Sequence, residues 1–394
     1  MINRLKTAIL LSYICIASIS AAIITPALPE IGRSYSLSHG ALEWVVSIFL
    51  LGYVIGQLFY GPLASRFGRI KALQSGLALN IIGILLCIMA TEMPNYSLLL
   101  LGRLVTALGA ASGLSCTFML LNESLSKEHA KQAMSFAIVS FTLGIGLAVT
   151  IGGLVTEYLN WKYCFWILLI HGFVMLFLTC LFQETLQHRV SLHPLTILLK
   201  LAQALKNKQL IVFSLTVGLV SAFAYGYSAV APIFAQTQLH LSASQYGYWN
   251  LVNMVGMLGS GFLSAFLIKN YGAKCVLILG LCFMLPILLS LGLLWFLGST
   301  SAIWFFITTT MLYLFSGLLF PTASYFASNA TTDKASASSM MSFINMSSAM
   351  IGVIVLGYLP FSSIGSLVIT LTLFFILVVF LILPYLMKAD MLLE

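Results

Sequence analysis

Long apolar runs, each able to cross a lipid bilayer as a helix, follow one another along nearly the whole chain. Crossing the hydrocarbon core takes about 20 apolar residues in a helix. Twelve runs meet this length, at 7–28, 41–64, 72–92, 97–121, 133–156, 163–182, 209–235, 246–268, 275–297, 302–327, 336–358 and 363–387. Within lipid every backbone polar group must be bonded inside the protein, which leaves helices or a closed barrel. Because barrel strands alternate apolar and polar residues and these runs do not, the sequence predicts an all-α membrane protein with twelve transmembrane helices.

The scarcity of charge disfavours most soluble functions. Charged residues make up 7% of the 394 residues and hydrophobic residues 60%, whereas a soluble domain is about 25% charged. A soluble enzyme, a nucleic-acid-binding protein and a disordered chain are all disfavoured. The net charge of +8 has another explanation, since Lys and Arg gather on the cytoplasmic side of membrane proteins. We expect the lipid bilayer as a partner and no nucleic acid.

The basic residues also predict the orientation. If the N-terminus is cytoplasmic, only Arg33, Arg103 and Lys162 of the 18 Lys and Arg residues lie outside the predicted cytoplasmic segments. This bias predicts that both termini are cytoplasmic. The run 7–28 follows Arg4 and resembles a signal peptide. Because it is long enough to cross and many more spans follow, we interpret it as the first span.

A polar, basic connection at 183–208 divides the spans into two sets of six. It predicts an N-terminal six-helix bundle at 1–186, a cytoplasmic linker at 187–208 and a C-terminal six-helix bundle at 209–394. The amphipathic pattern of the connection favours a short helix along the inner membrane interface. Glycines at one constant offset support a duplication, pairing Gly52 with Gly256, Gly68 with Gly272, and Gly153 with Gly357. Two similar halves that rock about a central site are the architecture of many secondary transporters.

A motif with characteristic spacing, G-P-L-A-S-R-F-G-R-I-K, follows the second span at 61–71. It resembles the loop signature of the major facilitator superfamily, with Gly61, Ser65, Arg66, Gly68 and Arg69 at signature positions. Gly61 is expected to let the second span approach a neighbouring helix closely, and Gly68 to permit a tight cytoplasmic turn. The family usually has Asp at the place of Ser65, and that acid forms ion pairs that hold the outward-facing state. Ser65 can only hydrogen-bond, and three basic residues alone would indicate no more than a cytoplasmic loop.

The fourth span contains Arg103, within L-G-R-L-V-T-A-L-G-A-A, which is similar to the family's RxxqGxgaA motif. A charged side chain inside a span costs several kcal/mol unless it is paired or hydrated. Arg103 lies about 9 Å from the outer end of the span, at about 1.5 Å per residue. It either snorkels to the outer headgroups, or faces inward and bonds helix carbonyls, a substrate or an acid. We favour the inward-facing arginine.

The fifth span contains Gly144, Gly152 and Gly153 in G-I-G-L-A-V-T-I-G-G. This stretch resembles the antiporter motif gxxxGPxxGG, with Ala148 and Val149 in place of the usual Gly and Pro. The small residues predict close helix packing. That packing belongs either to an antiporter motif or to a general small-residue face.

Segments of the second half resemble the bicyclomycin/chloramphenicol resistance (Bcr/CflA) subfamily more specifically. They are S-A-F-A-Y at 221–225, A-P-I-F at 231–234, L-S-A-S-Q-Y-G at 241–247 and A-S-A-S-S-M-M at 335–341. With G-Q-L-F-Y-G-P at 56–62 and E-T-L at 184–186, the likeness extends over nearly the whole chain. It implies a twelve-helix exporter of drugs or small molecules in a bacterial inner membrane.

The resemblance also implies that spans 1, 4, 7 and 10 line a central substrate cavity. The side chains of these spans and their neighbours that we expect to contact substrate are Ser18, Thr25, Arg103, Tyr225, Tyr227, Trp249, Asn250, Asn253, Tyr313 and Asn345. For the aromatic residues, packing is the alternative role. Aromatic and amide groups suit a mostly apolar compound with a few polar contacts. One buried base and no deep acid favour neutral, zwitterionic or anionic compounds over lipophilic cations.

Proton coupling needs a group that binds and releases a proton. Members of the subfamily often carry an Asp near the position of Ala22, and this chain does not. The best remaining candidates are Glu43, just inside the outer end of the second span, and Arg103 as its charge partner. We expect the two to separate when the outer gate opens, so that Glu43 takes up a proton. The alternative is a solvated acid at a helix start, favoured there by the helix dipole.

The leading interpretation is a monomeric secondary active transporter that exports small drug-like or metabolite molecules by alternating access in exchange for protons. The alternatives are an importer, a facilitator, or a siderophore or metabolite exporter with different or no proton coupling. We expect no enzymatic activity and no ATP drive, because the sequence contains no HExxH, GxSxG, GxxxxGK[ST] or paired acids within a span. We expect no metal and no cofactor, and the seven cysteines form no CxxC or metal-ligand cluster.

Overall fold

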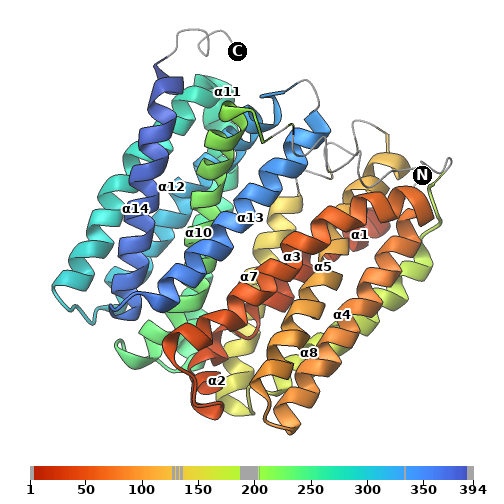
Figure 1. Cartoon of the computed structure of the whole chain (residues 1–394), viewed down its shortest axis with the longest axis horizontal. Helices are drawn as coiled ribbons and strands as arrows, with labels where there is room; N and C mark the ends of the chain where they lie inside the picture. The colour runs from red at the N-terminus through yellow and green to blue at the C-terminus, as the bar shows by residue number, and fades with distance from the viewer. Residues whose placement is uncertain are drawn as a thin grey trace. The chain divides into compact units, whose positions relative to one another are not determined.

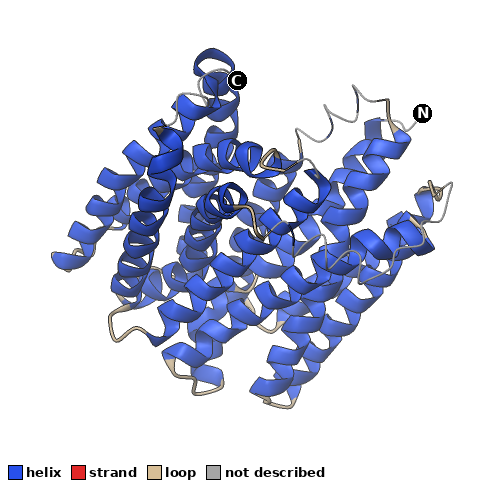
Figure 2. Cartoon of the chain, turned by 45° about the horizontal axis from the view of Figure 1, so that its top comes forward, coloured by secondary structure: helices blue, strands red, loops and turns tan. Residues whose placement is uncertain are grey.

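The computed structural model describes residues 4–126, 129, 133, 136–186, 203, 205–331 and 334–387. Every regular element in these ranges is a helix, as Figure 2 shows, so the all-α prediction is confirmed. The chain divides into two compact units, Met1–Leu192 with Ser242–Tyr248, and His193–Leu241 with Trp249–Glu394. Most of the predicted linker at 187–208, with the interfacial helix expected there, lies outside the described residues.

Unit 1 is built from long helices coloured red to yellow-green in Figure 1. In chain order they are α1 (Arg4–Ala22), α2 (Leu28–Ser34), α3 (His39–Phe67), α4 (Arg69–Glu92), α5 (Tyr96–Ser124), α7 (Ala137–Tyr158) and α8 (Tyr163–Leu178). Two 3₁₀ turns, Thr25–Ala27 and Thr179–Leu181, follow α1 and α8. Helix α5 packs against α1, α3 and α4, so it occupies the middle of the unit.

Unit 2 contains the helices coloured green to blue in Figure 1. They are α10 (Lys208–Thr237), α11 (Ala243–Phe296), α12 (Ala302–Ser328), α13 (Lys334–Tyr358) and α14 (Ser363–Leu386). The beginning of α11, as far as Tyr248, belongs to unit 1. Helix α10 packs against α12, α13 and α14. It therefore holds the middle of unit 2.

The number of membrane crossings follows from the length of α11. Among the described residues, eleven helices are long and apolar enough to cross a membrane. Helix α11 has 54 residues, more than twice what one crossing needs. Its backbone leaves the helical region at Gly272, with φ 79° and ψ 159°, so α11 comprises two spans. The described chain thus makes twelve crossings, as predicted.

Short polar side chains mark where several spans begin. In each case a serine or asparagine oxygen accepts a hydrogen bond from the backbone N–H three residues later, which satisfies a donor that the first turn leaves free. The capping residues are Ser38 for α3, Asn95 for α5, Asn207 for α10, Ser301 for α12 and Ser362 for α14. Replacing such a cap with alanine costs about 1 kcal/mol.

The first span is broken, although its apolar run predicts one helix over 7–28. Helix α1 ends at Ala22, and the 3₁₀ turn Thr25–Ala27 separates it from α2. The cause is Pro26, because proline has no backbone N–H and its ring clashes with the preceding turn of a helix. The apolar run alone does not predict this break.

The break leaves backbone carbonyls at the end of α1 without their usual donors. The last backbone bond of α1 runs from the Ile23 N–H to the Ile19 carbonyl, at 3.1 Å. The Thr25 hydroxyl donates to the Ala22 carbonyl at 2.9 Å, the bond that Pro26 cannot make. Among the described residues, no backbone N–H bonds the carbonyl of Ser20. That carbonyl accepts from a side chain of another helix instead, as described below.

Glycines at equivalent places bring helices together in each unit. A Cβ atom added to Gly52 of α3 would collide with the Leu104 carbonyl of α5. In unit 2, a Cβ added to Gly256 of α11 would collide in the same way with the Thr310 carbonyl of α12. The glycine offset in the sequence therefore relates two equivalent close contacts. This is the geometry expected of a duplicated bundle.

The turn glycines also correspond between the units, while Gly61 has a different role from the one expected. Gly68 has φ 117° and Gly272 has φ 79°, values that side-chain-bearing residues rarely adopt. Each ends one span and starts the next. A Cβ added to Gly61 would make only an ordinary 3.9 Å contact with Met119. The close approach of α3 to α5 is therefore made at Gly52, not at Gly61.

Candidate functional site

A buried arginine lies at the junction of α1, α3 and α5 in unit 1. Arg103 is 1% exposed. Its Nη1 donates to the Ser20 carbonyl of α1 at 2.7 Å, and its Nε donates to the Val45 carbonyl of α3 at 3.3 Å. The guanidinium carbon lies 4.3 Å from the centre of the Phe49 ring, a cation–π contact. The side chain is therefore held inside the unit by helix carbonyls and does not extend to the membrane surface.

The second titratable group of this region, Glu43, is buried without a partner for one oxygen. Glu43 lies on α3 and is 4% exposed. Its Oε2 has no hydrogen-bond partner. The ion pairs among the described residues do not include Glu43 with Arg103. The expected pair is thus absent in this structure, because the guanidinium is bonded to the carbonyls of Ser20 and Val45. The Ser20 hydroxyl is also buried without a partner.

Two further predicted site residues of the first span, Ser18 in α1 and Thr25 in the 3₁₀ turn, bond a carbonyl three residues earlier. The Ser18 hydroxyl donates to the Cys15 carbonyl at 3.0 Å, and Thr25 bonds Ala22 as described above. Both side chains are 2% exposed. Neither needs a partner from outside the unit.

The glycines of α7 admit the broken first span at close range. A Cβ added to Gly144 would collide with the Ser18 hydroxyl, and one added to Gly152 would collide with the Ile23 carbonyl at the break. Gly153 lies against the Ala243 carbonyl at the start of α11, in the segment that belongs to unit 1. Helix α7 therefore packs directly against the irregular backbone of the first span.

In unit 2, Asn253 is the centre of a buried hydrogen-bond network between α10, α11 and α12. Its Nδ2 donates to the Tyr227 hydroxyl at 2.6 Å. Its Oδ1 accepts from the hydroxyls of Thr309 at 3.0 Å and Thr310 at 2.8 Å. Sequence reasoning selected Asn253 and Tyr227 but missed both threonines, although three consecutive threonines in an apolar span are a detectable signal. This network ties three helices together.

Three aromatic candidates of unit 2, Tyr227, Trp249 and Tyr313, lie in one cluster of rings. Trp249 stacks on Phe306 with ring centres 5.0 Å apart, and Tyr313 lies 4.5 Å from Phe223 and 5.6 Å from Tyr227. Trp249 is half-buried, while the others are buried. The cluster is mainly helix packing, with Trp249 at its more exposed edge.

The remaining candidates of unit 2 are Asn250, Asn345 and Tyr225. Asn250 and Asn345 are buried, and Tyr225 is half-buried. Asn345 Oδ1 has no hydrogen-bond partner. It is therefore a polar atom of α13 with unused bonding capacity.

The loop between α3 and α4 is held by two carboxylates. The Arg69 guanidinium pairs with Glu123 of α5 at 2.6 Å, and its Nη1 donates to the Ala64 carbonyl at 3.0 Å. The carboxylate of Glu184 accepts from the backbone N–H groups of Arg69 at 2.7 Å and Ile70 at 3.1 Å. It therefore caps α4. An anion thus sits at this loop even though the signature acid is replaced by Ser65.

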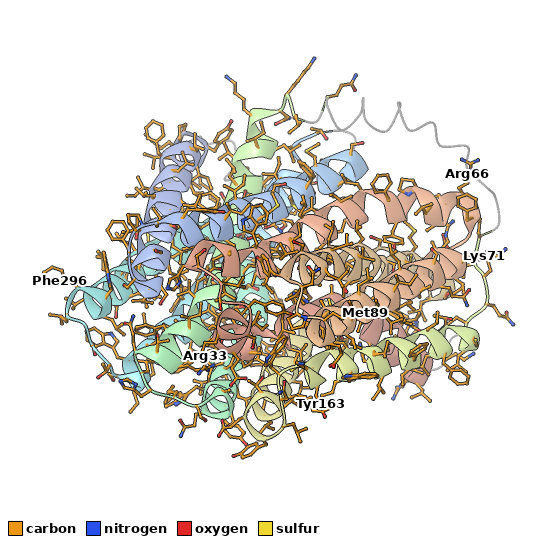
Figure 3. All side chains as sticks on the ribbon, turned by 60° about the horizontal axis from the view of Figure 1, so that its bottom comes forward. Arg33, Arg66, Lys71, Met89, Tyr163 and Phe296 are labelled. Carbon is orange, nitrogen blue, oxygen red and sulfur yellow. The ribbon has the colours of Figure 1, made fainter. Side chains whose placement is uncertain are left out.

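Only glycine fits beneath this cap. A Cβ added to Gly68 would collide with the Glu184 carboxylate. Ser65 is half-buried, whereas Arg66 is exposed, with its guanidinium 5.3 Å from the centre of the Phe67 ring. Figure 3 shows Arg66 and Lys71 at one end of unit 1, away from Arg33 and Tyr163. The sequence singled out Glu184 only as part of a family motif, because its contact with the loop spans more than a hundred residues.

We expect Glu184→Gln to lower thermal stability at neutral pH, by about 1–2 °C, given the value of a helix cap and the exposure of this carboxylate. Burial raises the pKa of Glu184, but backbone N–H bonds from Arg69, Leu186, Ile70 and Thr185 outweigh it and lower that pKa. A depressed pKa means that the stabilisation is present above the unfolded value of about 4.3 and is lost as the pH falls further. Thermal unfolding of both proteins from pH 7 down to about pH 2 measures this. Glu92→Gln is the control, and an equal gap at every pH would contradict the prediction.

Comparison with known proteins gives the same picture at three levels. The family model described as Major Facilitator Superfamily matches residues 10–355. An uncharacterized transporter of Rickettsia bellii is 26% identical over 291 residues, 72% of this chain and 70% of that protein. A bicyclomycin resistance protein homolog of Haemophilus influenzae is 22% identical, over 64% of this chain and 63% of that protein. The crystal structure of a D-xylose-proton symporter superposes with a TM-score of 0.75 at 16% identity, over 94% of this chain and 96% of that chain.

Proposed function

The chain belongs to the Major Facilitator Superfamily and is a membrane-spanning secondary transporter, and from this premise we propose that it exports small drug-like or metabolite molecules in exchange for protons. The proposed location is a bacterial inner membrane, with both termini cytoplasmic and a single chain as the working unit. Substrate would move by alternating access, in which its binding site opens in turn to either side of the membrane.

The observation that carries proton exchange is the state of Glu43. Among the described residues, it is the one buried Asp or Glu, and its Oε2 meets no donor. A buried carboxylate without donors is far costlier than a neutral carboxylic acid. The protonated form of Glu43 is therefore favoured in this conformation, and the ionised form becomes favoured when water or a cation reaches the side chain. That is the behaviour a coupling group needs.

Export of drug-like compounds is supported by kinship and by the polar groups of unit 2. A relative is named as a bicyclomycin resistance protein homolog. In unit 2 the half-buried Trp249 and the unpartnered Oδ1 of Asn345 offer an aromatic face and an amide. Such groups suit a compound that is mostly apolar with a few polar contacts. An importer or facilitator with different or no proton coupling is the alternative.

Reconstitution into proteoliposomes tests the proposal, with bicyclomycin as the probe. We expect concentrative transport of bicyclomycin only when a pH gradient is imposed across the membrane. Susceptibility of cells that lack their own exporters should fall when the protein is produced. Transport at the same rate with and without the pH gradient would favour a facilitator. Movement of bicyclomycin only into cells would favour an importer.

The orientation gives a separate prediction. We expect a cysteine at position 66 to react with a membrane-impermeant maleimide only in inside-out vesicles, because Arg66 lies in the basic loop. A cysteine at position 162 should react in intact cells, since Lys162 lies at the opposite end of unit 1. Both variants are made in a background without the exposed native cysteines at 180, 275 and 282. Labelling of position 66 in intact cells would overturn the topology.

A further inference from the structure

The guanidinium of Arg103 lies in an environment that holds it without neutralising it. All the partners found for it are uncharged: the Ser20 and Val45 carbonyls and the Phe49 ring. A buried charge is normally paired with an opposite charge. Among the described residues, no carboxylate lies within ion-pair distance of Arg103. The site therefore has an uncompensated positive charge.

The dipole of helix α1 compensates part of the positive charge of Arg103. The C-terminal end of α1 carries a partial negative charge of about half an electron from its unbonded carbonyls, and Arg103 bonds one of them at Ser20. The break at Pro26 exposes these carbonyls within the unit. The balance of the charge still lacks a partner. Carbonyls are also neutral acceptors that a stronger, anionic acceptor can replace.

Two neighbouring groups have hydrogen-bonding capacity that the protein does not use. The Ser20 hydroxyl belongs to the residue whose carbonyl holds Arg103, is 1% exposed and has no partner. Glu43, two residues before Val45 on α3, has an unpartnered Oε2 and would donate a hydrogen bond when it carries a proton. Buried polar groups are rarely left unsatisfied. An acceptor of a molecule bound at Arg103 would satisfy the Ser20 hydroxyl.

We propose that Arg103 binds an oxyanion of the transported molecule, such as a carboxylate or sulfonate, with the Ser20 hydroxyl as a second donor. The inference rests on the proposed transport function and adds oxyanions to the neutral compounds, such as bicyclomycin, with which that function is tested. In the empty state the guanidinium bonds the carbonyls of α1 and α3. In the loaded state its planar fork turns to the two oxygens of the oxyanion, the geometry that arginine favours.

Access to this site requires a movement of the first span. Arg103 is almost completely shielded in this structure, so a ligand reaches it only when the packing around it opens. The turn between α1 and α2 lacks the continuous backbone bonds of an α-helix. Release of the Ser20 carbonyl from Arg103 would loosen the end of α1. Binding of the oxyanion and bending of the first span are therefore linked.

Matched pairs of acids and amides test the substrate class with the purified full-length protein. The probes are benzoate with benzamide, octanoate with octanamide, and benzenesulfonate with benzenesulfonamide. We expect the acids to raise the melting temperature at concentrations about tenfold lower than the amides, the difference that one charge-assisted hydrogen bond provides. Arg103→Gln should weaken the effect of the acids about ten- to a hundredfold. Arg33→Gln, at an exposed arginine, should leave it unchanged.

A milder variant covers the case in which Arg103→Gln does not fold. Ser20→Ala keeps the backbone carbonyl that Arg103 bonds and removes only the unpartnered hydroxyl. We expect it to weaken the acids about fivefold, the value of one ordinary hydrogen bond. Ser112→Ala is the matched control, because that buried hydroxyl already bonds the Gly109 carbonyl at 2.8 Å. Its response to the acids should equal that of the wild type.

Three results would overturn the oxyanion site: amides that stabilise as well as acids, acids whose effect survives in the Arg103 and Ser20 variants, or no stabilisation by any acid. The measurement involves no pH gradient and no transport. Acid binding that depends on Arg103 would stand even if the protein proved to be an importer or a facilitator. A transport assay that showed no proton exchange would contradict the proposed function but would not contradict the oxyanion site.

Discussion

Replacing Arg103 with alanine is expected to abolish transport while the protein still reaches the membrane. The substitution removes the donors that bond the Ser20 and Val45 carbonyls. Each carbonyl left without a donor costs about 1–3 kcal/mol, so the melting temperature should also fall. Bicyclomycin transport in proteoliposomes measures the loss of activity, and membrane yield measures insertion.

Arg103→Lys separates the charge of this side chain from its shape. Lysine keeps the positive charge but lacks the planar arrangement of donors that reaches α1 and α3 together. We expect only weak recovery of transport. Wild-type transport by the alanine variant would instead show that Arg103 has no part in the mechanism. Arg33→Ala, at an exposed arginine paired with Glu30 at 3.7 Å, is the control and should transport normally.

Replacing Glu43 with glutamine is expected to abolish concentrative transport and to leave exchange of substrate across the membrane intact. Glutamine has nearly the same shape as glutamate but cannot bind and release a proton. Because Oε2 has no donor in the protein, a neutral amide costs nothing here in lost bonds. The melting temperature should therefore stay the same or rise. Accumulation driven by a pH gradient, compared with exchange at equal pH, separates the two activities.

The matched control is Glu92→Gln, at an exposed acid 3.8 Å from Lys162. It should behave as the wild type in both assays. If Glu43→Gln concentrates substrate as well as the wild type, Glu43 is not the proton carrier. In that case the coupling group lies elsewhere, or the transporter uses another ion.

The parts of the fold that follow from local chemistry could be predicted from the sequence. Apolar runs of sufficient length predicted the crossings, because lipid permits only helices over such stretches. The repeated spacing of Gly52 and Gly256 predicted equivalent packing, since both positions meet a carbonyl of a neighbouring helix. Gly68 was expected in a turn, and its φ of 117° places it there.

What escaped prediction depends on contacts between distant segments. Pro26 causes the break in the first span. The break frees a carbonyl that accepts from Arg103, and this contact between distant residues cannot be read from the sequence. The spacing of Glu43 and Arg103 in the span map placed them at one depth. It did not determine which way each side chain turns, and the carbonyls of Ser20 and Val45 take the place expected for the acid.

Glu184 illustrates the same limit at the membrane surface. Its carboxylate accepts from the first N–H groups of α4. The family's signature acid is absent here, because position 65 is a serine. No local pattern connects residue 184 with residue 69. The anion at this loop is therefore a property of the folded unit and is invisible in the motif itself.

The two units share an equivalent glycine contact but differ in the charge beside it, and this difference has an electrical consequence. Arg103 precedes the α5 carbonyl that meets Gly52, while Thr309, a neutral residue, precedes the α12 carbonyl that meets Gly256. When Glu43 carries a proton, unit 1 holds a net positive charge within the membrane and the matching place in unit 2 holds none. A full elementary charge that crosses the membrane field does work of about 2.3 kcal/mol per 100 mV. Any displacement of Arg103 along the membrane normal takes a fraction of this, so the membrane voltage itself biases which conformation unit 1 adopts.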